Sequence, residues 1–123
     1  VCRFGAIKHD WKIDAGELQK RIAEHALGAV HGKKGKTGYL NFLTSITKDC
    51  DCLVKNQKPA MADIGILAGT DPVAVDAASL DLVREKAGGT LGNVFYTDID
   101  PEVQLDHAEK IGLGSREYDL VTL

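Results

Sequence analysis

The sequence predicts an α/β fold: a single compact domain with a mostly parallel sheet flanked by helices. The run Ile64-Gly65-Ile66-Leu67-Ala68-Gly69 is almost continuously apolar, which is typical of a strand buried on both faces of a parallel sheet. Thr70-Asp71-Pro72 follows at once and has the chemistry of a helix start. A strand, a short turn and a helix in this order form the middle of an α/β unit with parallel pairing. The 123 residues suffice for one domain with one modest core.

The first third of the chain predicts one helix. Residues Ala6 to Ile13 alternate loosely, as in a short strand or an extended segment. From about Ala15 to Val30, apolar residues recur at i, i+4 spacing and predict the inner face of a helix; they are Leu18, Ile22, Ala26 and Val30. Asp14 stands three residues before Glu17, the spacing of a capping box. The helix should end at Gly32-Lys33-Lys34-Gly35-Lys36, where glycine supplies a left-handed residue and lysines meet the helix dipole.

The middle of the chain predicts a strand followed by a long loop. Tyr39 to Ile46 is rich in aromatic and β-branched residues, which favour a strand. Thr47 to Ala62 is polar, and it contains Cys50, Cys52 and Pro59. Loops of this length in a compact domain are usually functional or disordered. We expect a functional loop, because it follows a core strand.

The last part of the chain predicts two helices and a final strand. The first begins at Pro72 and ends at Ala87-Gly88-Gly89; its apolar stripe consists of Ala74, Val75, Ala77, Ala78 and Leu82. Thr90 to Asp98 is irregular and has two aromatic residues that we expect to be exposed, Phe95 and Tyr96. Asp100-Pro101-Glu102 repeats the helix-start chemistry, and Gly112 ends this helix; its expected inner face is Val103, Ala108 and Ile111. Glu117 to Leu123 alternates as a strand does.

Composition narrows the class of protein. Hydrophobic residues make up 44% of the chain and charged residues 27%, as in ordinary globular proteins. A net charge of −3 argues against unspecific nucleic-acid binding, which needs a basic patch. No apolar run approaches the roughly 20 residues of a membrane helix. The chain shows no signal peptide, and because it begins at Val1 without Met we expect a processed or trimmed product.

The cysteines predict reduced or metal-bound thiols rather than disulfides. There are three, Cys2, Cys50 and Cys52, which is an odd number. Cys50 and Cys52 are separated by one residue, which is poor geometry for an unstrained mutual disulfide. These features fit a cytoplasmic protein better than a secreted scaffold held by disulfides.

The sharpest local motif is Lys48-Asp49-Cys50-Asp51-Cys52. In an extended backbone Cys50 and Cys52 point to one side, and Asp49 and Asp51 point to the other. Two thiolates on one side suit a single soft metal ion or two corners of an iron–sulfur cluster. A tetrahedral site needs four ligands, so two must come from elsewhere: Cys2, His9 and a partner chain are the candidates. The alternative is a pair of reduced cysteines in a polar loop.

Two aspartates near the second helix start are further candidate site residues. Asp71 is explained by helix capping alone. Asp76 lies in the second turn, between Val75 and Ala77, in a stretch that we expect to be buried, where a carboxylate must be paired or have a raised pKa. It also follows the carboxyl end of a strand, where α/β sheets gather their ligands. A ligand, metal or catalytic role for Asp76 therefore competes with a structural role.

The chain resembles a family of uncharacterised iron–sulfur-centre proteins built on the domain of unknown function numbered 362. The resemblance is carried by the stretch from Asn41 through Cys52, by Asp63 to Val83, and by Val103-Gln104-Leu105 with Ala108 to Tyr118. The family commonly carries a ferredoxin-type insertion, and Val1 to Ile7 resembles its tail, with Arg3 where proline is usual. The resemblance implies that this is the C-terminal α/β portion of a larger protein. It also implies that Cys2 is the last ligand of a 4Fe-4S cluster whose other cysteines lie upstream.

Three hypotheses about function follow. The chain belongs to an iron–sulfur or metal-associated protein, with electron transfer to a redox partner protein or a single metal ion at Cys50 and Cys52. Alternatively, it is an enzyme in which Asp49, Asp51 and Asp76 hold a divalent ion or a substrate. The third hypothesis is a structural domain only. No Ser-His-Asp or Gly-x-Ser-x-Gly pattern indicates a reaction, and the sequence does not indicate an oligomeric state.

Overall fold

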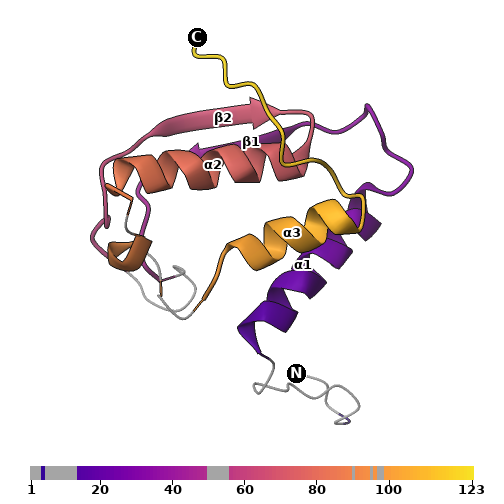
Figure 1. Ribbon diagram of the computed structural model, residues 1–123, viewed down its shortest axis with the longest axis horizontal. Helices are drawn as coiled ribbons and strands as arrows, with labels where there is room; N and C mark the ends of the chain where they lie inside the picture. Colours follow the sequence, from indigo (N-terminus) through magenta and orange to yellow (C-terminus); the bar gives the residue numbers. More distant parts are fainter. Residues whose placement is uncertain (1–3, 5–13, 50–55, 90, 95, 97–98) are drawn as a thin grey trace.

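The computed structural model describes residues 4, 14–49, 56–89, 91–94, 96 and 99–123. Its elements, in chain order, are α1 (Ala15–Val30), β1 (Tyr39–Leu43), β2 (Gly65–Gly69), α2 (Pro72–Lys86), the 3-10 turn η1 (Leu91–Asn93) and α3 (Glu102–Lys110). The three layers are the sheet, α2, and the pair formed by α1 and α3. Helix α2 packs on the sheet with one side and on α3 with the other (Figure 1). No helix in these ranges is long and apolar enough to cross a membrane.

The mixed α/β class is confirmed, but the prediction of a mostly parallel sheet is wrong. In the described residues the sheet has two strands, which pair antiparallel with Tyr39 opposite Gly69 and Leu43 opposite Gly65. Parallel neighbours need a crossover, usually a helix, and the described part of the connection between β1 and β2 contains none. The apolar run of β2 was misleading. Its side chains alternate between half-buried and exposed positions instead of being buried on both faces.

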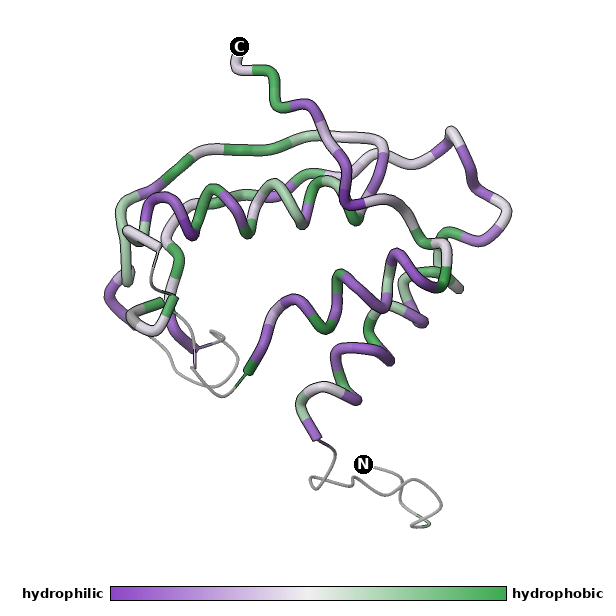
Figure 2. Tube along the Cα trace, in the orientation of Figure 1, coloured by the Kyte–Doolittle hydropathy of each residue, from purple (hydrophilic) through white to green (hydrophobic). Residues whose placement is uncertain are grey.

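One face of the sheet is covered by α2, and the other is exposed and apolar. Leu40 is 62% exposed, Phe42 63% and Ile66 59%. Figure 2 shows that hydrophobic residues run along β2, whereas hydrophobic and hydrophilic residues alternate along α2. The sequence predicted a strand buried on both faces. In the residues that the structure describes, only the face toward α2 is covered.

Two further strand predictions differ from the structure, and one lies outside it. β1 ends at Leu43 rather than Ile46, because Ser45 has a positive φ of 51° and its N–H donates to Asp63 Oδ1 at 2.7 Å. Residues 117–123 form no strand and are exposed. The segment Ala6 to Ile13 lies outside the described residues.

Helix α1 has the predicted bounds but a different buried face. Its only buried residue is Ala23, whereas Leu18 and Ile22 are 52% and 47% exposed. The small side chain of Ala23 joins a core cluster with Leu105 and Ala108 of α3, and small residues allow helices to approach closely. Burial on α1 is thus decided by contact with α3 rather than by the larger apolar residues.

The ends of α1 confirm one prediction and correct another. Asp14 is the N-cap residue, but its side chain makes no capping hydrogen bond, and Glu17 pairs with Arg21 instead of closing a capping box. At the other end Gly32 has a φ of 71°, as predicted. Lys33 Nζ donates to the carbonyl oxygen of Ala29 at 2.6 Å, so a lysine does meet the free carbonyls of the last turn.

Helix α2 is the best predicted element and the centre of the molecule. Asp71 and Pro72 begin it, and Gly88 and Gly89 follow its end with positive φ angles of 70° and 83°. Its buried residues face both neighbouring layers; they are Val73, Val75, Ala77, Ala78, Ser79 and Val83. At Gly69 a Cβ atom would lie 2.6 Å from Val75 Cγ2, so glycine allows the end of β2 to rest on the helix.

Helix α3 begins at Glu102 and ends before Gly112, which has a φ of 77°, as predicted. Its buried residues are Leu105 and Ala108, whereas Val103 and Ile111 of the expected inner face are half-buried. Leu105 and Ala108 share the core cluster with Val73 and Ala77 of α2. The core therefore sits where α1, α2 and α3 meet.

Candidate functional site

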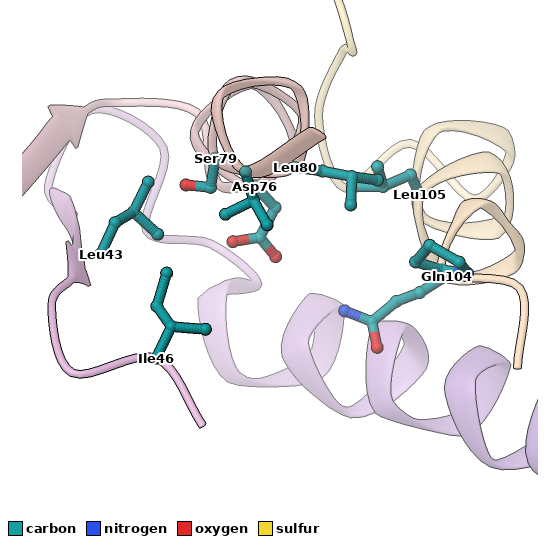
Figure 3. Close-up of a pocket in the computed structure, with 9 residues that line it drawn as sticks. Leu43, Ile46, Asp76, Ser79, Leu80, Gln104 and Leu105 are labelled. Atoms are coloured by element: carbon teal, nitrogen blue, oxygen red, sulfur yellow. The ribbon is translucent and has the colours of Figure 1, made fainter. Parts of the chain in front are cut away.

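A cleft opens between the end of β1, α2 and the start of α3. Its volume is about 370 Å³, within the range of about 300–1,000 Å³ that is usual for small-molecule sites. Its apolar walls are formed by Leu43, Ile46, Leu80, Val83, Pro101 and Leu105. Its polar lining residues are Asp76, Ser79 and Gln104. Figure 3 shows the Asp76 carboxylate and the Gln104 amide pointing into this space from α2 and α3.

Asp76 is held at the rim of the cleft by a residue of β1. Asn41 Nδ2 donates to Asp76 Oδ1 at 2.8 Å and to Ser79 Oγ at 3.0 Å, and the Ser79 hydroxyl donates to the Val75 carbonyl oxygen at 2.6 Å. The expectation that Asp76 is buried is wrong, because its residue is exposed. Asp76 lies on the sheet side of α2, but the cleft there is open to solvent. Its carboxylate therefore stays in contact with water and does not have to be paired. The network fixes its direction and leaves one oxygen facing solvent.

Asp71 acts as a structural link in the described structure. Its Oδ1 accepts from the backbone N–H groups of Val73 and Ala74 at 2.8 and 3.1 Å, and its Oδ2 accepts from Ser115 N at 2.9 Å. It thereby caps α2 and ties the chain after α3 to it. Asp71 lines a second, larger hollow bordered by β2 and residues 117–123, and Asp76 lines the first. The structure does not bring these two aspartates together.

The two flanks of the cysteine loop are hydrogen-bonded to each other. Asp49 N donates to Gln57 Oε1 at 3.1 Å, and Gln57 Nε2 donates back to the Asp49 carbonyl oxygen at 2.7 Å. The Thr47 hydroxyl donates to that same carbonyl at 2.9 Å, and the Tyr96 hydroxyl donates to the Asp49 carboxylate. Lys48 Nζ lies 4.7 Å from the centroid of the Tyr96 ring, a cation–π geometry. The two sides of the 50–55 stretch are thus bound to each other at 49 and 57.

The predicted thiol ligands lie outside the described residues. Cys2, Cys50, Asp51 and Cys52 all fall there, as does His9. Among the residues that the structure does describe, no group of three or more His, Cys, Asp or Glu side chains could hold a metal ion. Asp49 and Asp76 are each hydrogen-bonded to a different residue, Tyr96 and Asn41 respectively.

Sequence reasoning missed three residues that organise these sites. Asn41, Gln57 and Gln104 are neutral amides, and neither charge nor metal-ligand spacing singles them out. Asn41 alone carried a signal: an amide inside an apolar strand needs a partner when it is half-buried. Its i, i+2 alternation with Tyr39 and Leu43 placed it on the face of β1 that α2 covers.

A carboxylate–guanidinium cluster fixes the start of α3 beside the cleft. Glu102 pairs with Arg84 of α2 and with Arg116, which also pairs with Asp106. Burial alone would raise the pKa of Glu102, but hydrogen bonds and charge from Arg84 and Arg116 together outweigh it, so the pKa is lowered from 4.5. Burial alone would lower the pKa of Arg116, but hydrogen bonds and charge from Glu102 and Asp106 outweigh it, so this pKa is raised.

The described residues form a small mixed α/β domain with an apolar cleft and with hydrogen bonds between Asp49 and Gln57, which flank Cys50 and Cys52 in the sequence. The family model described as "Domain of unknown function (DUF362)" matches residues 2–81, more than half of the chain. The chain belongs to this family, which confirms the predicted membership. No curated protein and no solved structure is significantly similar to the chain.

Proposed function

We propose that this chain is the metal-binding part of an iron–sulfur-associated protein, in which Cys50 and Cys52 supply two thiolate ligands to one soft metal ion in a reducing, cytoplasmic setting. The support from sequence is the Cys-x-Cys spacing, because alternate residues of an extended segment present their sulfur atoms on one side. The observation that carries the proposal is the clasp between Asp49 and Gln57 at the base of the loop.

The clasp matters because ordering a loop costs conformational entropy. Bringing the ends of a flexible segment together is unfavourable, and a ligand set whose loop is already closed binds more tightly. Gln57 closes this loop through both of its amide groups, and Tyr96 holds the side chain of Asp49. The residue immediately before Cys50 is therefore fixed in backbone and side chain.

A complete 4Fe-4S cluster does not fit this chain by itself. Such a cluster takes four cysteine ligands, and the chain has three. We therefore derive no electron-transfer step from these residues. A single ion at Cys50 and Cys52 needs two more ligands, for which Cys2, His9 or a partner chain are the candidates.

The hypothesis of a divalent-ion site formed by Asp49, Asp51 and Asp76 has less support. Hard cations such as Mg²⁺ and Ca²⁺ need several oxygen ligands at one point. Asp49 and Asp76 have separate hydrogen-bond partners, and Asp71 is engaged by three backbone N–H groups. These engagements favour the thiolate site.

The proposal is tested by metal analysis of the chain prepared without oxygen. Iron, zinc and acid-labile sulfide are measured per chain for the natural sequence and for the Cys50→Ser, Cys52→Ser double variant. We expect bound metal in the first and none in the second. Gln57→Ala should keep the same metal-to-chain ratio but bind up to about thirtyfold more weakly, because two hydrogen bonds worth about 1 kcal/mol each are lost from the loop base.

The result that would overturn the proposal is equal metal content in the natural chain and the double serine variant. Absence of metal from both would favour the purely structural hypothesis. Asp76→Asn is the matched control, because Asp76 lines the cleft and its hydrogen-bond partner in the described residues is Asn41 rather than a residue of the clasp. Its metal content should equal that of the natural chain, whereas the divalent-ion hypothesis requires a loss.

A further inference from the structure

The cleft between β1, α2 and α3 has a chemistry of its own that the metal proposal does not use. Its two sides are apolar: Leu43 and Ile46 lie on one, and Leu105 on the other (Figure 3). The buried residue Val83 and the half-buried Leu80 contribute from α2. A ligand that fills such a space must therefore have an apolar body.

The polar groups of the cleft are few and have distinct roles. The hydroxyl of Ser79 is already engaged, since it accepts from Asn41 and donates to Val75. The carboxylate of Asp76 accepts one hydrogen bond, from Asn41, and has no other partner among the described residues. In the same ranges the Gln104 amide is half-buried and makes no hydrogen bond. The Asp76 carboxylate is therefore an acceptor available to a ligand, and the Gln104 amide offers both an acceptor and a donor.

The charge of the lining is negative. Asp76 is the one charged residue among those that line the cleft in the described structure. Arg84, on the same helix, is engaged by Glu102 and Asp81. An anionic ligand would meet a carboxylate with no lining cation to offset it, and a bare divalent ion would find one carboxylate where it needs several.

We propose that this cleft binds a small organic cation, with its ammonium group beside Asp76 and Gln104 and its aromatic or aliphatic body between Leu43, Ile46 and Leu105. Asn41 is a positioning residue, because it holds the carboxylate that meets the ammonium group. The ammonium hydrogens satisfy the acceptor groups, and the apolar body displaces water from the walls. The proposal makes no use of Cys50 or Cys52.

The proposal is tested with three probes of nearly equal size: 2-phenylethylammonium, neutral 2-phenylethanol and anionic phenylacetate. Their binding is followed by the chemical shifts of backbone amide groups in the natural chain. The cation should bind most tightly and the anion most weakly, and the amide signals of Leu43, Asp76 and Gln104 should move. This mapping requires no variant to fold.

Variants separate charge from shape. Asp76→Asn should weaken binding of the cation by roughly three- to fivefold, the gain typical of an ion pair that remains partly solvated, and should leave 2-phenylethanol unchanged. Glu85→Gln is the matched control, because Glu85 is an exposed carboxylate of α2 outside the cleft, and it should change neither.

Three results would overturn the proposal: no binding of the cation, equal binding of all three probes, or shifted signals confined to residues away from the cleft. The double serine variant at Cys50 and Cys52 should bind the cation like the natural chain. Failure of the cleft proposal therefore leaves the metal proposal standing, and failure of the metal proposal leaves the cleft proposal standing.

Discussion

Gly114 shows how one missing side chain allows a distant contact. It lies beside the Asp71 carboxylate, and a Cβ atom built at Gly114 would overlap that carboxylate. The carboxylate in turn accepts from Val73, Ala74 and Ser115. Glycine is needed here for close approach of the chain to the cap, so the residue that begins α2 also holds the segment that follows α3.

We expect Gly114→Ala to destabilise the fold by about 1–3 kcal/mol, because the methyl group displaces Asp71 from its backbone partners. Gly28→Ala is the control: Gly28 lies within α1 with no heavy atom near its Cβ position, and alanine there should stabilise the helix by about 0.5–1 kcal/mol. Chemical denaturation monitored by circular dichroism measures both. Equal effects in the two variants would show that the link from Asp71 to Ser115 does not support the fold.

At the scale of elements, α2 and α3 are joined by charge as well as by the core. Glu102 opens α3 and pairs with Arg84 of α2 and with Arg116 beyond α3. Its side chain is 25% exposed, so solvent screens these pairs only in part. The cluster fixes the α3 end of the cleft, next to Gln104.

The lowered pKa of Glu102 makes this cluster sensitive to acid. A carboxyl group with a lower pKa in the folded state contributes stability above its unfolded pKa of 4.5, and that contribution is lost as the pH falls through the folded value. We therefore expect Glu102→Gln to be less stable than the natural chain at pH 7, and the difference to shrink steadily below pH 4.5.

Urea denaturation at a series of pH values measures this difference, with Glu85→Gln as a control on α2. A gap between the natural chain and Glu102→Gln that stays constant from pH 7 down to pH 3 would contradict the account. So would a gap of the same size and pH dependence in the control.

Helix ends were predictable because they depend on local chemistry. Asp71 with Pro72, Gly88 with Gly89, and Gly112 mark helix ends by properties that each residue carries by itself. Which face of a helix is buried depends on its neighbours. Leu18 and Ile22 are large apolar residues of α1 that stay about half exposed, yet the small Ala23 is the one packed into the core with α3.

At the scale of the whole molecule, strand pairing could not be derived from the apolar pattern. The run around Ile66 is as apolar as that of a central parallel strand, but it pairs antiparallel with β1 and leaves Ile66 exposed beside Leu40 and Phe42. A short apolar run indicates how much hydrophobic surface a strand has, but it does not indicate which strand pairs with it or in which direction.

The candidate site residues likewise fall into those that the sequence indicates and those that only the fold reveals. Asp49, Asp71 and Asp76 were found from sequence because carboxylates near helix starts and cysteines are conspicuous. The partners of Asp49 and Asp76, which are Asn41, Gln57 and Tyr96, are 8 to 47 residues away along the chain. Pairings over such distances are produced by the fold, and the residue types themselves carry no information about them.

The exposed apolar face of the sheet is a further feature at the scale of the whole molecule. Leu40, Phe42 and Ile66 form a continuous patch across two strands. Contiguous apolar patches of this kind are uncommon on monomeric proteins. Asp76 lies on the opposite side of the sheet, where α2 packs and where Asn41 of β1 contacts it, so a partner covering the exposed face would leave Asp76 accessible.

The central claim is that Cys50 and Cys52 bind one soft metal ion. X-ray absorption at the zinc edge, on the chain loaded with one equivalent of Zn²⁺ without oxygen, tests it most directly. The account predicts sulfur neighbours at about 2.3 Å from the zinc, and their disappearance in the Cys50→Ser, Cys52→Ser variant. Zinc surrounded only by nitrogen and oxygen in the natural chain would contradict it.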